Sequence, residues 1–139
     1  MNAGTQAGYS GTPLAKKLGF KPGMKVLLTD MPQTVRDDIA GNCVGLIEVS
    51  APSDGFFAAH LFTTERAVIE RDLPALMAAM DRDGFVWVSW PKKASKVPTD
   101  ITEDTIREIA LPIGLVDVKV CAVDAVWSGL KLMIRKELR

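Results

Sequence analysis

The sequence is short of the residues that usually build metal sites and disulfide scaffolds. It contains one histidine, one tyrosine and two cysteines in 139 residues. Cys43 and Cys121 lie far apart and belong to no CxxC motif or Cys/His cluster, which argues against both a zinc site and a disulfide framework. We therefore expect both cysteines to be buried thiols, and we expect no metal.

The sequence also lacks an excess of charge of either sign. Its 17 basic residues equal its 17 acidic residues, so long-range attraction to nucleic acid or to an anionic membrane is not expected. There is no run of about 18 apolar residues that would cross a membrane, and the first residues have no basic stretch followed by an apolar one. These absences predict a cytoplasmic protein without nucleic-acid or membrane partners.

What is present is the composition of a soluble globular protein. Apolar residues make up 47% of the chain and charged residues 24%, and a chain of this length suits one domain. Glycine and small polar residues dominate the start, so we expect residues 1–8 to be flexible and residues 9–139 to form a single domain.

Short apolar runs alternate with amphipathic stretches along most of the chain. KVLLT at residues 25–29 is bounded by turn-forming residues, as expected for a strand buried on both faces. The same reasoning predicts strands at residues 44–49, 56–62 and 85–90, the last entered through a turn at Asp83 and Gly84, and helices at residues 14–18, 33–40, 64–80 and 102–113. Strands that alternate with helices indicate an α/β protein with a parallel sheet covered on both sides.

The last segment has a different pattern. Valines at positions 116, 118 and 120 alternate with polar residues, and alternation resumes after the turn predicted at Trp127 to Gly129. This pattern is typical of an antiparallel hairpin with one wetter face. The sequence therefore predicts a three-layer fold with a mostly parallel six-stranded sheet and a C-terminal antiparallel hairpin.

The stretch LGFKPGMKVLLTD, from Leu18 to Asp30, is similar to the opening of class I methyltransferases that use S-adenosylmethionine. VGLIEVS resembles their second strand, and Glu48 falls where the family has the acidic residue that holds the ribose hydroxyls. SDGFFAAHLF, MAAMDRDGFVWVSWP and the final hairpin follow in the family's order. The resemblance implies a minimal Rossmann-like scaffold with strand order 2-1-4-5-7-6 in the family's numbering, the last strand being inserted antiparallel.

Two departures from the family pattern affect the cofactor. After the first strand the family has an acidic residue and glycines that let the backbone approach the cofactor, whereas this chain has Thr29, Asp30, Met31 and Pro32, which block such an approach. The family's third strand and its helices, which help to form the adenine pocket, are also missing. We expect no cofactor; the alternative is S-adenosylmethionine held by Asp30 and Glu48.

The whole chain is more similar to a small bacterial family of unknown function. That resemblance rests on GYSGTPLAKKLG at residues 8–19, WPKKAS at residues 90–95 and LPIGLVDVKVCAVDAVWSGLK at residues 111–131. These strings imply no particular activity.

Ligands of open α/β sheets bind beyond the carboxyl ends of the strands. In the PKKAS segment Lys92 and Lys93 offer ammonium groups and Ser95 offers a hydroxyl, with Trp90 and Trp127 as apolar walls, which would suit a small anion or nucleotide. The competing interpretation is a solvated basic loop. Tyr9 and Ser10 precede a helix and are a second candidate for anion binding, or they pin the N-terminal segment to the sheet.

No catalytic constellation is recognisable. His60 lies within an apolar strand, which favours a hydrogen-bonded core imidazole over a general base, and no motif surrounds a nucleophile. The sequence therefore favours a non-catalytic ligand-binding or regulatory module on a degenerate methyltransferase scaffold. One alternative is a divergent methyltransferase or nucleotide-using transferase. The other is a protein-interaction domain that pairs through its hairpin edge, for example with a second copy of itself in a homo-oligomer.

Overall fold

The computed structural model describes residues 12–139; the flexibility expected for residues 1–8, and the candidate residues Tyr9 and Ser10, lie outside these described residues. The strands are β1 (Lys25–Thr29), β2 (Ile47–Val49), β3 (Phe56–Phe62), β4 (Met80–Pro91), β5 (Leu115–Ala122) and β6 (Trp127–Ile134). The helices are α1 (Leu14–Leu18), α2 (Gln33–Asn42), α3 (Arg66–Ala79) and α4 (Glu103–Ile113), with 3-10 turns η2 (Pro52–Asp54), η3 (Lys93–Ser95) and η4 (Lys136–Leu138).

The six strands form one mixed sheet in the order β2-β1-β3-β4-β6-β5. The first four pair in parallel, while β6 runs antiparallel to both β4 and β5. This arrangement confirms the predicted mostly parallel sheet with a C-terminal antiparallel hairpin, in the predicted order.

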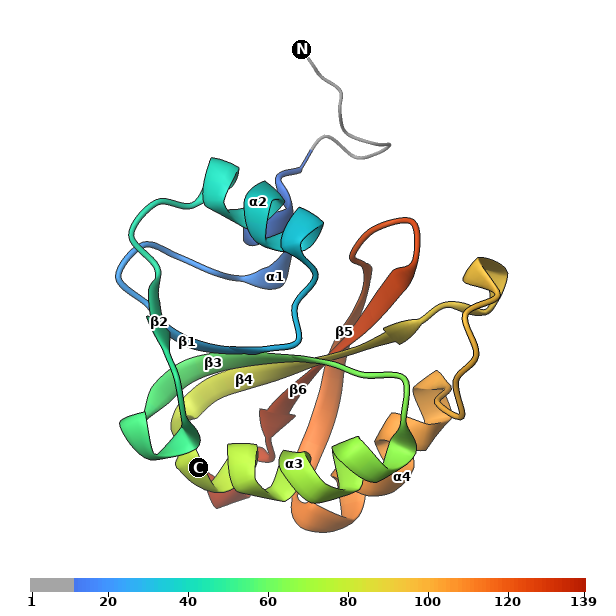
Figure 1. The fold of residues 1–139 in the computed structure, drawn as a ribbon. Coiled ribbons are helices and arrows are strands. Elements are labelled where there is room, and N and C mark those ends of the chain that lie inside the picture. Colours follow the sequence, from blue (N-terminus) through green and yellow to red (C-terminus); the bar gives the residue numbers. More distant parts are fainter. Residues whose placement is uncertain (1–11) are drawn as a thin grey trace.

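Helices cover the sheet on both sides. Figure 1 shows α1 and α2 on one face and α3 and α4 on the other. The buried apolar side chains accordingly form two clusters, because successive residues of a strand point to opposite faces. In β4, for example, Val86 and Val88 belong to the cluster under α3 and α4, whereas Phe85 and Trp87 belong to the cluster under α1 and α2.

Trp87 anchors the short helix α1 to the centre of the sheet. Its side chain is fully buried, and its indole Nε1 donates a hydrogen bond of 2.8 Å to the backbone oxygen of Leu18. The helix ends at Gly19, whose φ of 80° lies in the left-handed region that favours glycine. Five residues are too few for a helix to be stable alone, so packing and this hydrogen bond hold α1 in place.

Two predicted turns are misplaced. Asp83 and Gly84 do not turn the chain, because β4 already begins at Met80, and at Gly84 a Cβ atom would lie 1.9 Å from the Phe57 oxygen of the adjacent strand. This glycine serves close strand contact rather than a turn.

The hairpin turn lies before Trp127, not at it. The Asp124 carboxylate accepts hydrogen bonds of 2.8 Å from the backbone nitrogens of Val126 and Trp127, the local bonding that makes aspartate a turn former. Trp127 therefore begins β6 and pairs with Pro91. Within residues 12–139 no helix has the length and apolar character needed to cross a bilayer.

Replacing Trp87 by phenylalanine should lower the free energy of unfolding by at least about 1–3 kcal/mol, because it leaves the buried Leu18 oxygen without its donor. Trp127→Phe is the matched control, since the Trp127 side chain is half-buried and its indole nitrogen has no acceptor among the described residues. Urea unfolding of both variants measures the difference. Equal losses would contradict the anchoring role of Trp87.

Candidate functional site

The loop after β1 is filled by side chains. Asp30 is exposed and has a φ of 55°, in the left-handed region that non-glycine residues seldom adopt. The following Met31 is only 6% exposed and packs into the cluster under α1 and α2. A ligand that needs backbone contact here would meet the Cβ of Asp30 and the buried side chain of Met31.

Glu48 is engaged by a residue of the same chain. It lies in the middle of β2, and its two carboxylate oxygens accept hydrogen bonds of 2.8 and 2.9 Å from Arg36 of α2. The hydrogen bond from Arg36 lowers the pKa of the Glu48 carboxyl, against a smaller opposing effect of burial, and the same bond raises the pKa of Arg36. Glu48 is therefore ionised and paired at neutral pH.

The basic loop after β4 is organised by its serine. The Ser95 hydroxyl donates to the Lys92 oxygen at 2.7 Å and accepts from the Val97 nitrogen at 3.2 Å. Both hydrogen bonds therefore stabilise a local turn, and the hydroxyl is not directed at a ligand site. Within residues 12–139 neither Lys92 nor Lys93 forms an ion pair, so both ammonium groups are free to meet solvent or an anion.

The two tryptophans expected as walls of this loop lie on opposite faces of the sheet. Trp90 is buried in the cluster under α3 and α4. Trp127 packs with the cluster under α1 and α2, edge-on to the Phe62 ring at a centroid distance of 5.2 Å. The structure thus brings Lys92, Lys93 and Ser95 together but does not make one seat between the two indoles.

His60 is a core residue, as predicted. It is fully buried, its Nε2 lies 2.7 Å from the Ser89 hydroxyl oxygen, and its ring stacks on Phe62 at 4.3 Å. Burial lowers the pKa of His60 to about 3. The imidazole is therefore neutral at physiological pH and has no access to a substrate.

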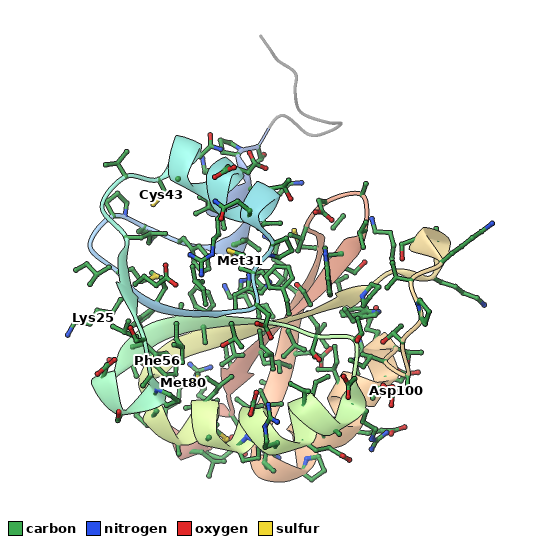
Figure 2. The ribbon with its side chains drawn as sticks, in the orientation of Figure 1. Lys25, Met31, Cys43, Phe56, Met80 and Asp100 are labelled. Atoms are coloured by element: carbon green, nitrogen blue, oxygen red, sulfur yellow. The ribbon has the colours of Figure 1, made fainter. Side chains whose placement is uncertain are left out.

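A hollow of about 640 Å³ opens between α2 and the strands β1 and β2. Apolar side chains line most of it, and the Arg36–Glu48 pair lies at its polar side. Figure 2 labels Met31 and Cys43, two of its lining residues, which come just before and just after α2 in the chain. The full lining is Val26, Leu28, Met31, Gln33, Arg36, Asp37, Ile39, Ala40, Cys43, Val44, Gly45, Leu46 and Glu48.

Sequence reasoning found Glu48 but missed the hollow beside it. The available signal was the short connection from β2 to β3, which leaves no room for a further strand, so β2 lies at the edge of the sheet. Val44, which lines the hollow, is 82% exposed.

A second hollow of about 680 Å³ lies near the amino ends of β1, β3 and β4. Figure 2 labels Lys25, Phe56 and Met80 there. It contains none of the residues predicted to bind a ligand. Among the described residues no group of three or more histidine, cysteine, aspartate or glutamate side chains is arranged to hold a metal ion.

The buried imidazole predicts a specific pH dependence of stability. The folded-state pKa of His60 is about 3 and its ordinary value is 6.5, so below that value the unfolded chain takes up a proton that the folded chain does not bind. The free energy of unfolding should therefore fall by about 1.4 kcal/mol per pH unit between about pH 6 and 5, before carboxylates titrate. Urea unfolding across this range tests it, with His60→Gln expected to remove the slope; equal slopes would contradict a neutral buried His60.

No family model and no curated protein matches the chain. Solved structures do match. A S-adenosylmethionine-dependent methyltransferase from Aquifex aeolicus aligns with a TM-score of 0.59 at 13% identity, covering 87% of each chain. The ribosomal protein L11 methylase from Lactobacillus delbrueckii subsp. bulgaricus aligns with a TM-score of 0.54 at 12% identity, covering 88% of this chain and 75% of the other.

A third structure with this fold is named for a different reaction. A [4+2]-cyclase aligns with a TM-score of 0.57 at 9% identity, covering 88% of this chain and 79% of the other. At these identities the likeness concerns the fold, and one fold can carry different chemistries. The chain therefore has the fold of the class I S-adenosylmethionine-dependent methyltransferases.

Proposed function

We propose that this chain is a non-catalytic small-ligand-binding or regulatory module on a methyltransferase scaffold that has lost its cofactor site. The observation that carries the proposal is the pairing of Glu48. Both of its oxygens are bound by Arg36 at 2.8 and 2.9 Å. Glu48 is the carboxylate that the methyltransferase resemblance would assign to a ribose, and here it has a partner within the chain.

The loop after β1 supports the same proposal. No glycine occurs between Gly23 and Gly41, so the chain has side chains throughout the stretch where the related enzymes bring backbone against their cofactor. Asp30 and the buried Met31 occupy that position. The loss of glycine and the pairing of Glu48 are separate changes, and both act against an adenosyl ligand.

The hollow beside α2 is the ligand site that we favour. Ligand pockets are usually concave and mostly apolar, with a few polar groups that orient the ligand. The charges at its polar side are Arg36, Glu48 and Asp37, so the positive charge is already neutralised. We therefore propose a small, largely apolar ligand without negative charge, such as a single ring system.

The basic loop after β4 remains a proposal for a small anion. In the part of the chain that the structure describes, neither Lys92 nor Lys93 forms an ion pair, although the Ser95 hydroxyl is engaged in its own turn. Lysine binds phosphate as a flexible point charge. Such a seat would therefore depend on the two lysines and not on Ser95 or Trp127.

A divergent methyltransferase or other nucleotide-using transferase is the second candidate, and one observation favours it. Arg36 and Glu48 are 33% and 42% exposed. Such surface pairs contribute only about 0.2–1 kcal/mol, so a ribose could displace Arg36 at small cost. This candidate requires S-adenosylmethionine to bind in spite of Asp30 and Met31.

A third candidate function is protein interaction through the exposed edge of the hairpin. β5 is an outer strand of the sheet, and its Val118 and Val120 are about half exposed. Open edges of this kind can pair with a strand of another chain. Sedimentation over a range of concentrations tests whether copies of this chain associate.

S-adenosylhomocysteine should not raise the melting temperature, because the loop after β1 leaves no backbone approach and Glu48 is already paired. The measurement is thermal unfolding with and without the compound, where binding at about 100 times the dissociation constant would add about 2.7 kcal/mol of stability. The proposal fails if the melting temperature rises and Glu48→Ala removes the rise. Asp38→Ala, which removes an exposed carboxylate from α2, is the matched control.

An uncharged ring compound such as indole should bind in the hollow beside α2. Ala40 lines the hollow and is exposed, so Ala40→Phe should fill the space and abolish the indole-dependent rise in melting temperature while the free protein stays about as stable. Ala67→Phe, on the exposed side of α3, should leave the rise intact. Indole binding that survives in Ala40→Phe would remove the hollow from the proposal.

A further inference from the structure

Three lysines from distant parts of the chain meet on the face of the sheet that α1 covers. Lys119 of β5 and Lys131 of β6 are direct partners in the antiparallel pairing. The Lys119 ammonium also donates a hydrogen bond of 3.2 Å to the backbone oxygen of Lys17, at the end of α1. The fold thus places Lys119 and Lys131 side by side next to the end of α1, which carries Lys17, although these residues lie up to 114 positions apart in the sequence.

Lys131 is the most constrained of the three. Its side chain is half-buried, and its ammonium nitrogen lies 4.3 Å from the centroid of the Phe85 ring. Burial, together with the charge of Lys119, lowers the pKa of Lys131. The ring face stabilises a cation but offers no negative charge, so the ammonium group keeps its hydrogen-bond donors for another partner.

No carboxylate of the described chain neutralises this cluster. Within residues 12–139 every ion pair is formed by an arginine, and none is formed by a lysine. The first acidic residue in the sequence is Asp30, so the 29 residues before it bring lysines and no acid. Three like charges that share one surface without a counter-charge repel one another.

The pKa of the nearby Cys121 thiol is affected by two of these lysines. Burial raises its pKa, while the charges of Lys17 and Lys119 both act in the opposite direction. Cys121 lies two residues beyond Lys119 on β5, and both residues face α1 through their pairing with Gly129 and Lys131 of β6. The positive charges of Lys17 and Lys119 therefore both act on the Cys121 thiol.

We propose that Lys17, Lys119 and Lys131 form a binding site for a phosphate group of a small molecule. A phosphate dianion has several acceptor oxygens and can receive hydrogen bonds from more than one ammonium group, each of which rotates freely to meet it. A net charge of 0 for the chain argues against nucleic acid or a membrane as the source of the phosphate. This site is separate from the hollow beside α2 and from the loop of Lys92 and Lys93.

The test is calorimetric titration of the full chain with inorganic phosphate at constant ionic strength, with chloride as the balancing anion. Lys131→Met keeps an unbranched side chain one atom shorter and removes its charge, and we expect it to weaken phosphate binding at least about tenfold. Lys119→Gln should also weaken binding. Without phosphate, each variant removes a repulsive charge but also a favourable contact, with the Phe85 ring for Lys131 and with the Lys17 oxygen for Lys119, so we expect only small changes in melting temperature.

The double variant Lys92→Gln/Lys93→Gln is the matched control and should bind phosphate as the wild type does. The proposal is overturned if millimolar phosphate does not bind the wild type. It is also overturned if the double variant loses binding while Lys131→Met keeps it, which would move the anion to the loop after β4. Binding of an acidic peptide without binding of phosphate would overturn it in favour of a protein partner.

A second measurement does not depend on substitution. The lowered pKa of Lys131 makes its amine a preferred target of an amine-reactive reagent at mildly alkaline pH, and peptide mass mapping identifies the modified residue. Bound phosphate should slow labelling of Lys131 and Lys119 and leave Lys136, an exposed lysine in η4, unaffected. Equal labelling of Lys131 with phosphate and with chloride would contradict the site.

Discussion

The central strands β1, β3 and β4 are covered on both faces, and each strand must supply apolar side chains to two clusters. Polar atoms that enter the core are mostly paired: the Trp87 indole donates to the Leu18 oxygen, and His60 Nε2 lies 2.7 Å from the Ser89 hydroxyl oxygen. The exception is His60 Nδ1, which is buried without a hydrogen-bond partner among the described residues. The same packing explains the short helix α1, which the Trp87 indole holds to the sheet. The positions of α1 and α2 then determine which surfaces beyond the core remain open.

The hollow beside α2 lies where β2 forms the edge of the sheet. With no strand beyond β2, the side of α2 next to that strand borders a hollow, and Arg36 reaches across to Glu48. Met31, in the loop after β1, is buried in the cluster under α1 and α2. The proposal of a lost cofactor site rests on these two features, a loop filled by side chains and a paired Glu48.

Most of the fold was predictable because doubly covered strands are continuous apolar runs and the hairpin alternates. The errors arose where one residue type serves two purposes, as when Gly84 allows close contact with Phe57 rather than a turn. The candidate site was less predictable: the contact of Arg36 with Glu48 requires α2 to pack over β2, and the meeting of Lys17 with Lys119 depends on the tertiary fold. The alternation of residues along β4 and β6 was, by contrast, a signal in the sequence that Trp90 and Trp127 point to opposite faces of the sheet.

The central claim is that side chains close the turn after β1 to an adenosyl group. Amide chemical shifts of Asp30, Met31 and Glu48, followed by nuclear magnetic resonance during titration with S-adenosylhomocysteine, test it most directly. The account predicts that the chemical shifts of these three amides do not change at S-adenosylhomocysteine concentrations that saturate ordinary methyltransferase sites. Saturable shifts of all three amides would contradict it.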